Sequence, residues 1–273
     1  GTVNTINQAV RAARKMAEDA SVQSREVCDI SELMIATECG GSDATSGLAA
    51  NPVVGNVSDK IVDAGGSSMM SETTEFVGAE HILARRGATP EIHDEIIKIC
   101  RDLEIHLGNV NQDLRTGQPT PGNKEGGLST IEEKSLGCIY KGGTRPIVEV
   151  VKCSHIPTKK GCIVMDTPGY DTVSVSAMAA GGCQVMLFTT GRGTPTGLGI
   201  MPVIKVTGNK HTYEHMKDNM DFDTSDVISG TKTIDQLGDA LLNELLLVCN
   251  GKITKAESYG FSDVAINRMC SFI

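Results

Sequence analysis

The chain has 273 residues, 40% of them hydrophobic and 22% charged, which is the composition of an ordinary folded protein rather than a disordered one. Aromatic residues make up only 3% and the formal net charge is −9, so a nucleic-acid partner is disfavoured. No apolar run approaches the roughly 20 residues that span a bilayer, so we expect no membrane segment and a cytoplasmic protein. The nine cysteines form no C-x-x-C pair, which favours reduced thiols over a zinc ribbon.

Short apolar runs alternate with helical patterns along the first half of the chain. The predicted elements are, in order, an amphipathic helix over 4–19, a buried strand over 33–36, a helix over 53–64, a short strand over 67–70, helices over 77–86 and from Pro90 through Leu107, and a helix over 130–137. The polar segment 108–127 is predicted to be a long loop, and loops of that length are usually functional.

The second half continues the alternation. The predicted elements are strands over 146–151 and 162–165, a helix over 173–180, strands over 185–188 and 203–206, and a helix over 234–249. This order predicts an α/β fold with a largely parallel, Rossmann-like sheet flanked by helices. We interpret 1–273 as one catalytic portion, and a glycine-rich seam near 142–146 suggests two lobes, 1–144 and 145–273.

Three of the predicted strands end on polar turns, at 39–46, 166–171 and 189–194. If these strands are parallel neighbours, the turns meet in one cleft, which is where α/β proteins usually bind their ligands. The first turn belongs to the stretch 39–52, which is rich in glycine and short polar side chains. A well-capped turn that binds nothing is the alternative interpretation of that stretch.

Several charged side chains are candidates for chemistry. Glu80 and His81 lie next to Arg85 and Arg86, a combination that suits metal ligation or general base catalysis, although a surface ion-pair cluster is an equal alternative. Arg192 lies between two glycines after a buried strand and is the best candidate for an anion clamp. Asp166 ends a buried strand, where a carboxylate is costly unless it is paired, hydrogen-bonded or bound to a metal.

Three other motif matches lack the surrounding sequence that their usual function requires. Asp166-Thr-Pro-Gly169 resembles a GTPase motif, but no phosphate-binding P-loop accompanies it. Gly191-Arg-Gly193 precedes a strand rather than a helix, so no nucleotide cofactor is expected. His211 and His215 match H-x-x-E-H, but the polarity of the segment favours a solvated helix face over a zinc site.

Five ordered motifs together carry a resemblance to a known family. They are Cys39-Gly-Gly-Ser-Asp with Ala49-Ala-Asn-Pro52, Pro121-Gly-Asn-Lys-Glu-Gly-Gly127, Glu133-Lys-Ser-Leu-Gly137, Asp166-Thr-Pro-Gly-Tyr-Asp171 and Phe188-Thr-Thr-Gly-Arg-Gly193. In this order they resemble the large catalytic portion of the altronate dehydratase/galactarate dehydratase family. The large subunit of sulfolactate sulfo-lyase is similar to both enzymes, so the substrate stays open.

The resemblance implies an activity and a metal. Members of this family remove water from sugar acids to give 2-keto-3-deoxy products, and they depend on a divalent metal, for which iron(II) is the expected ion. On this basis the catalytic candidates are Asp43, Glu80, His81, Lys124 and Asp166. The metal-ligand candidates are Cys39, Asp43, His81 and Asp166. The candidates for substrate binding are Ser42, Ser46, Asn51, Arg86, Asn123, Thr190 and Arg192.

The resemblance also implies partners. The small N-terminal domain of the fused enzymes is absent from this chain, so it is expected either as a separate domain or subunit or as a part that has been trimmed away. We also expect a homo-oligomer that takes a small anionic sugar acid as its substrate. Two alternatives stay open, namely elimination of sulfite from sulfolactate and a sugar-acid-binding core without catalytic activity.

Overall fold

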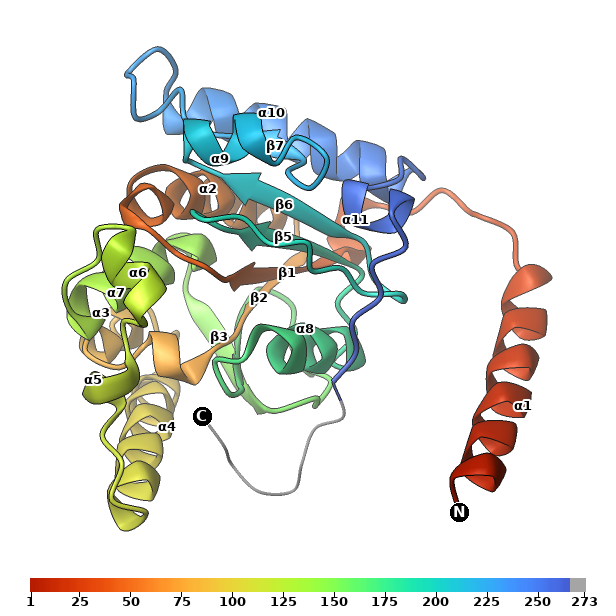
Figure 1. Cartoon of the computed structure of the whole chain (residues 1–273), viewed down its shortest axis with the longest axis horizontal. Coiled ribbons are helices and arrows are strands. Elements are labelled where there is room, and N and C mark those ends of the chain that lie inside the picture. Colours follow the sequence, from red (N-terminus) through yellow and green to blue (C-terminus); the bar gives the residue numbers. More distant parts are fainter. Residues whose placement is uncertain (266–273) are drawn as a thin grey trace.

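The computed structural model describes residues 1–265, which form one seven-stranded sheet with helices on both faces (Figure 1). The strands lie in the order β3-β4-β2-β1-β5-β6-β7, and every pair is parallel. Their bounds are β1 Met34–Cys39, β2 Ser67–Met70, β3 Ile147–Lys152, β4 Cys162–Asp166, β5 Val185–Thr189, β6 Val203–Thr207 and β7 Phe222–Asp223. The predicted α/β class with a parallel sheet is therefore confirmed.

The longer helices agree with the periodic segments of the sequence. Their bounds are α1 Thr2–Ser21, α2 Asn51–Asp63, α3 Glu80–Ala84, α4 Pro90–Asn109, α5 Leu114–Gly117, α6 Pro121–Glu125, α7 Ile131–Ile139, α8 Asp171–Ala180, α9 Lys210–His215, α10 Ile234–Cys249 and α11 Lys255–Ser258. Single turns complete the set: the 3-10 turns η1 Ile30–Glu32, η3 Thr73–Glu75 and η4 Tyr140–Gly142, and the π-helical turn η2 Ser46–Ala50. Within residues 1–265, no helix combines the length and the apolar character that crossing a membrane requires.

The helices cover the two faces of the sheet unequally. On one face, α2 and α10 pack against β1, β5 and β6. On the same face, α3 and α4 pack against β2, β3 and β4. The other face packs against α8 (Figure 1). Because the strands are covered on both sides, they are short continuous apolar runs rather than alternating ones, as the sequence predicted.

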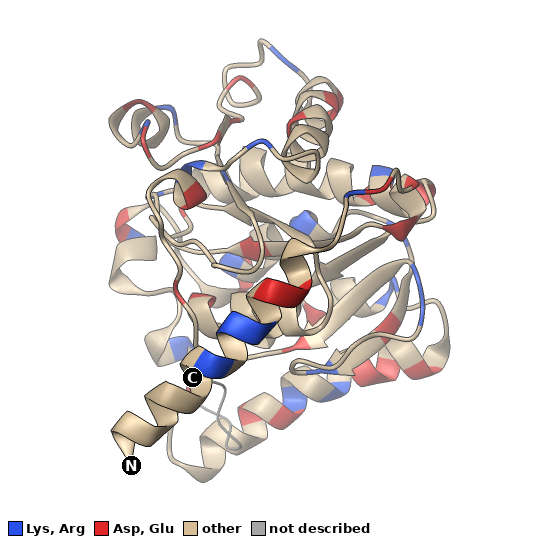
Figure 2. Ribbon diagram, turned by 90° about the vertical axis from the view of Figure 1, so that its right-hand side faces the viewer, with Lys and Arg blue, Asp and Glu red and all other residues tan. Residues whose placement is uncertain are grey.

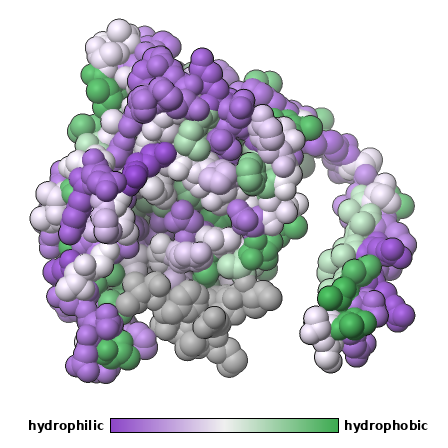
Figure 3. All heavy atoms as spheres, in the orientation of Figure 1, coloured by the Kyte–Doolittle hydropathy of each residue, from purple (hydrophilic) through white to green (hydrophobic). Residues whose placement is uncertain are grey.

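Helix α1 projects away from the rest of the molecule (Figure 1). None of its residues is buried, and its charged residues lie between Arg11 and Asp19 (Figure 2). Apolar side chains lie along the projecting helix in Figure 3, where Val3, Ile6, Val10 and Met16 are between 44% and 73% exposed. The predicted amphipathic helix is therefore present, but its apolar face packs against nothing among the described residues.

The segment 108–127 differs from the predicted long loop, because it contains α5 and α6. Asp113 caps α5 by accepting a hydrogen bond from the Arg115 backbone N–H, and Thr120 forms a capping box with Asn123 at the start of α6. Each helix is only a turn or so long, so no apolar periodicity marks it in the sequence. The structure joins no two of the cysteines within residues 1–265 in a disulfide, and Cys270 lies outside the described residues.

The two strands from the first half of the chain lie between strands from the second half. The central strands β1 and β2 come from the first half, and β4 and β5, which flank them, come from the second. β1 pairs on one side with β2, where Met34 faces Ser67, and on the other with β5, where Ile35 faces Val185. All carboxyl ends therefore lie along one edge of a sheet to which both halves contribute.

Candidate active site

The three polar turns lie along the carboxyl edge of the sheet, where β1 and β5 are neighbours and β2 separates β4 from β1. The backbone N–H of Arg192 donates to the Gly41 carbonyl at 2.9 Å, which joins the turns after β1 and β5. The turn after β4 approaches the end of β1 at Gly40, where a Cβ atom would lie 2.2 Å from Asp171 Oδ2. Only glycine allows such a close approach, which explains the first glycine of this turn.

Buried ionisable side chains gather where β1 and β2 end. Glu38 and Cys39 point to opposite faces of the sheet, because side chains alternate along a strand, and Glu72 follows β2 between them. α7 and η4 contribute to one face and the first residue of α8 to the other. We call this group the edge cluster; it consists of Glu38, Cys39, Glu72, Glu75, Lys134, Cys138, Lys141 and Asp171.

The ammonium group of Lys141 is at the centre of the edge cluster. Its Nζ lies 3.2 Å from Cys39 Sγ and 3.1 Å from Cys138 Sγ, and it contacts the Glu72 carboxylate. The two sulfur atoms are 3.6 Å apart, and the side chain of Lys141 is 0% exposed. A second buried pair lies nearby, with Lys134 Nζ 2.8 Å from Glu75 Oε1.

Two sets of side chains within the edge cluster have the geometry of metal ligands. Cys39, Glu72 and Cys138 form one set, which we call the thiol triad, and their ligand atoms lie within 4.8 Å of one another. Glu38, Glu72 and Asp171 form the other set, the carboxylate triad, within the same distance. Glu72 belongs to both, so the triads are neighbours.

The carboxyl groups of the edge cluster repel one another. Burial raises the pKa of Glu38 well above its ordinary value, and the charge of Glu72 adds to the effect. Burial also raises the pKa of Glu72, although Lys141 opposes this change. The pKa of Asp171 is raised to about 7, first by burial and then by Glu72 and Glu75. The cluster has four carboxyl groups and two ammonium groups, and burial favours the neutral carboxyl forms, so a bound cation would stabilise the ionised forms.

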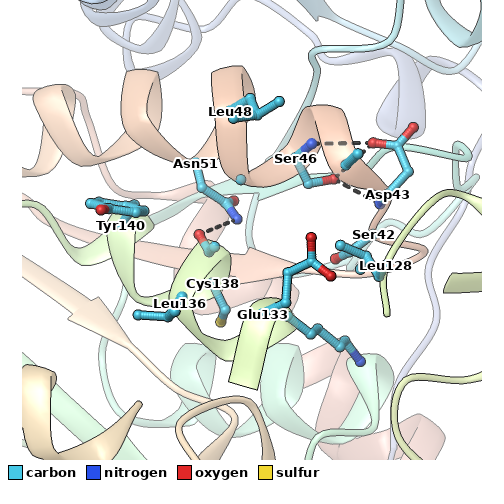
Figure 4. Close-up of a pocket in the computed structure, with 14 residues that line it drawn as sticks. Ser42, Asp43, Ser46, Leu48, Asn51, Leu128, Glu133, Leu136, Cys138 and Tyr140 are labelled. Atoms are coloured by element: carbon cyan, nitrogen blue, oxygen red, sulfur yellow. Dashed lines mark hydrogen bonds between the residues drawn. The ribbon is translucent and has the colours of Figure 1, made fainter. Parts of the chain in front are cut away.

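A pocket of about 230 Å³ adjoins the edge cluster (Figure 4). Ser46 and Asn51 lie on one wall, on η2 and the start of α2, and Leu136 lies on the facing wall, on α7. Lys134 and Cys138 line the same pocket. A molecule in the pocket would therefore contact two members of the edge cluster directly.

Four residues predicted from the first turn line this pocket, namely Ser42, Asp43, Ser46 and Asn51. The carboxylate of Asp43 is engaged on both oxygens, because it accepts hydrogen bonds from Thr45, Ser46 and the amide of Asn209. The amide of Asn51 donates to the Gly137 carbonyl at 2.8 Å and accepts from the Thr189 hydroxyl at 2.6 Å.

Three further predicted residues lie around the first turn without lining the pocket. The buried amide of Asn123 donates to the Ser42 carbonyl at 2.8 Å. Thr190 is buried, and its hydroxyl accepts a hydrogen bond from the Gly193 backbone N–H. The guanidinium of Arg192 packs on Gly122 and lies 3.2 Å from Glu125, with 46% of its side chain exposed.

The other predicted residues lie apart from one another, except that Cys39 belongs to the edge cluster. Glu80 accepts a hydrogen bond from the Gly78 backbone N–H, and His81 is exposed on α3. The guanidinium of Arg86 donates to the carbonyls of Gly142 and Arg145, and Lys124 is exposed on α6. Asp166 accepts a hydrogen bond from the Thr73 hydroxyl beside β2. Within residues 1–265, neither metal-ligand set contains His81, Asp43 or Asp166.

The sequence interpretation missed most of the edge cluster, although two signals were present. Glu38 occupies a buried strand, where a carboxylate is costly without a partner. Lys134, Cys138 and Lys141 follow one another at spacings of four and three residues, which places them on one face of a helical segment. Together these signals would have indicated a buried polar centre between a strand and α7.

Comparisons with known proteins agree with the motifs. The chain matches the family described as "D-galactarate/Altronate dehydratase, C-terminal" over residues 30–271. It is 37% identical over 257 residues to the altronate dehydratase of Bacillus subtilis (strain 168), a match that covers 94% of this chain and 51% of that protein. It is 38% identical over 252 residues to the galactarate dehydratase (L-threo-forming) of Escherichia coli (strain K12), covering 92% of this chain and 48% of that protein.

A third relative has a different name. The chain is 39% identical over 271 residues to subunit beta of the (2R)-sulfolactate sulfo-lyase of Chromohalobacter salexigens, a match that covers 98% of this chain and 70% of that subunit. The chain spans about half the length of the two dehydratases. With a family match across most of its length, this chain belongs to the D-galactarate/altronate dehydratase family and corresponds to the C-terminal portion of those enzymes.

Proposed function

We propose that this chain is the catalytic portion of a metal-dependent hydro-lyase, which removes water from a sugar acid such as altronate or galactarate and leaves a 2-keto-3-deoxy acid. The names of two relatives support this reaction. The observation that carries the proposal is the edge cluster, a set of buried carboxyl, thiol and ammonium groups that adjoins a pocket of about 230 Å³. That pocket is smaller than the roughly 300–1,000 Å³ typical of drug-sized ligands, so it suits a small organic acid.

The reaction places three demands on a site. The proton next to a carboxylate is weakly acidic, so a base must remove it while positive groups stabilise the enediolate that forms. A general acid must then protonate the departing β-hydroxyl group. A bound divalent cation supplies a Lewis acid for the developing negative charge.

The residues of the edge cluster fit a divalent cation. The thiol triad offers sulfur ligands and the carboxylate triad offers oxygen ligands, and iron(II) accepts both kinds. Burial is the main cause of the raised pKa values of Glu38, Glu72 and Asp171, and a bound cation would stabilise the ionised forms of these groups. We therefore propose that one of these two triads holds the metal, with iron(II) as the ion.

Lys134 and Glu75 are suited to the substrate's reacting end. The Lys134 ammonium lines the pocket and donates to Gln118 at 2.6 Å and to Glu75, so one of its three hydrogens remains for a substrate carboxylate. Glu75 Oε2 is buried without a hydrogen-bond partner in the described part of the chain. An oriented carboxylate with a free oxygen is a candidate base for the α-proton.

The polar side chains of the first turn are candidates for the substrate hydroxyl groups. Ser42 and Ser46 line the pocket, whereas Asp43 and Asn51 hold the turn in shape through their hydrogen bonds. Arg192 and Lys124 are exposed beside the turns, where they would attract an anionic substrate. Arg192→Ala tests this contribution, since undiminished catalysis by the folded variant would exclude Arg192 from the site.

A direct assay tests the proposal. The chain is incubated with altronate, galactarate and (2R)-sulfolactate in parallel, with iron(II) and with a chelator, and 2-keto acid and sulfite are measured. We expect metal-dependent 2-keto acid formation from a sugar acid, and a loss of at least about tenfold in Lys134→Met. Lys98→Met is the matched control, because Lys98 is 69% exposed on α4. No turnover of any substrate, alone or with the N-terminal portion of a relative added, would support a non-catalytic binding core instead.

One observation favours a second function. At 39% identity over 271 residues, the sulfo-lyase subunit is as similar to this chain as the two dehydratases are, at 37% and 38%. Elimination of sulfite from sulfolactate begins with the same proton abstraction and differs in the leaving group. Release of sulfite without dehydration of either sugar acid would assign this function to the chain.

A further inference from the structure

Lys141 occupies the position between two thiols and a carboxylate that a metal ion would take. We propose that Lys141 is a built-in cation that fills the thiol triad and positions Glu72, so that the metal binds at the neighbouring carboxylate triad. This inference deepens the proposed function and rests on it only in requiring that a metal is bound.

The contacts of Lys141 match the chemistry of an ammonium group. A lysine ammonium has three hydrogens and no lone pair, and Lys141 Nζ has three acceptors around it. These are Cys39 Sγ at 3.2 Å, Cys138 Sγ at 3.1 Å and the carboxylate of Glu72. The side chain is fully buried, so water has no part in this arrangement.

The spacing of the sulfur atoms alone does not distinguish an ammonium from a metal. Tetrahedral bonds of roughly 2.3 Å to two sulfurs would place them about 3.8 Å apart. The observed separation of Cys39 Sγ and Cys138 Sγ is 3.6 Å, which suits either cation. The Lys141 ammonium distinguishes the two cases, because a metal bound to both thiols would have to displace this buried charge, which has no acceptor outside the triad among residues 1–265.

The backbone of Lys141 is held as firmly as its side chain. Lys141 belongs to η4, which follows α7 directly, and its carbonyl accepts a hydrogen bond from the Ser58 hydroxyl at 2.9 Å. Ser58 is a buried residue of α2, so this hydrogen bond links η4 to a core helix. Expulsion of the ammonium would therefore require η4 to separate from α2.

The carboxyl groups that lack a cationic partner lie on the other side of Glu72. Glu72 is paired with Lys141, but neither Glu38 nor Asp171 forms an ion pair with any residue between 1 and 265. Glu38 accepts hydrogen bonds from the Ser71 hydroxyl at 3.1 Å and the Ser174 hydroxyl at 2.5 Å, which fix its orientation. Carboxylate ligands held by outer hydrogen bonds are typical of sites for hard divalent cations.

Cobalt(II) bound to the whole chain provides the test, because thiolate ligands give it a strong near-ultraviolet charge-transfer band and carboxylates do not. We expect the unmodified chain to bind cobalt(II) without that band. Glu38→Gln and Asp171→Asn should weaken binding at least about tenfold, whereas Cys39→Ser and Cys138→Ser should change it less than about threefold. Cys249→Ser, outside the edge cluster, is the matched control for the thiol variants.

Lys141→Met should vacate the thiol triad and produce the charge-transfer band. A band in the unmodified chain, or a tenfold loss of affinity in the thiol variants, would overturn the inference even if Lys141→Met did not fold. The proposed function would survive that result if sugar acids were still dehydrated. Absence of cobalt binding would overturn both, while binding at the carboxylates without turnover would leave this inference standing and refute the proposed reaction.

Discussion

Breaking the buried pair of Lys134 and Glu75 should lower stability strongly, and Lys134→Met measures the cost of leaving Glu75 without its cation. Their side chains are only 8% and 5% exposed, and Nζ lies 2.8 Å from Oε1. Since Glu75 Oε2 already lacks a partner, the variant leaves a buried carboxylate without any cation. Breaking such a pair costs about 3–5 kcal/mol. At roughly 2–4 °C per kcal/mol for a chain of this size, the melting temperature should fall by about 6–20 °C.

Thermal and urea denaturation of the metal-free chain, followed by circular dichroism, are the assays. Adding Glu75→Gln to Lys134→Met removes the orphaned charge and should restore most of the lost free energy of unfolding. Lys98→Met, on the exposed face of α4, should leave the melting temperature unchanged. A loss below about 1 kcal/mol in Lys134→Met would refute the reasoning, because the pair would then behave like a surface ion pair.

Four further outcomes follow from other features of the site and fold. Gly40→Ala would put a Cβ atom 2.2 Å from Asp171 Oδ2, so it should lower stability by about 1–3 kcal/mol and weaken metal affinity, both measurable by calorimetry. Asn51→Ala removes the link between Gly137 and Thr189 and should cost about 1–3 kcal/mol in urea denaturation. Deletion of residues 2–21, none of them buried, should leave the melting temperature of the remainder unchanged. Chelation should abolish dehydration and iron(II) should restore it, whereas activity in the chelator would contradict metal dependence.

Most helices and strands could be predicted because their signals are local. The apolar runs at 33–36, 162–165 and 185–188 correspond to β1, β4 and β5, and the stripe that begins after Pro90 corresponds to α4. The order of the strands could not be predicted, because β1 pairs with β5 across 150 residues of sequence, as Ile35 and Val185 illustrate. Apolar patterns indicate that a strand is buried but not which strand lies beside it.

The candidate site likewise has one part that the sequence predicts and another part that it does not. Ser42, Asp43, Ser46 and Asn51 follow one strand closely, so a local motif brings them to one pocket. The edge cluster depends instead on α7 packing against the ends of β1 and β2, a contact between segments about 70 to 100 residues apart. Charge and residue type also mislead for exposed side chains: His81 suits metal ligation chemically, yet it lies on the solvent side of α3.

The position of β1 and β2 between strands that come later in the sequence affects when the site can form during synthesis. β1 and β2 leave the ribosome early, but β4 and β5, which flank them, are about 100 to 150 residues further along. Pairings at such separations close slowly, because the entropy of a long loop is lost before any contact compensates for it. Until residue 189 has emerged, Glu38 and Cys39 stand on an open strand edge, and the metal-binding groups should form as one of the last steps of folding.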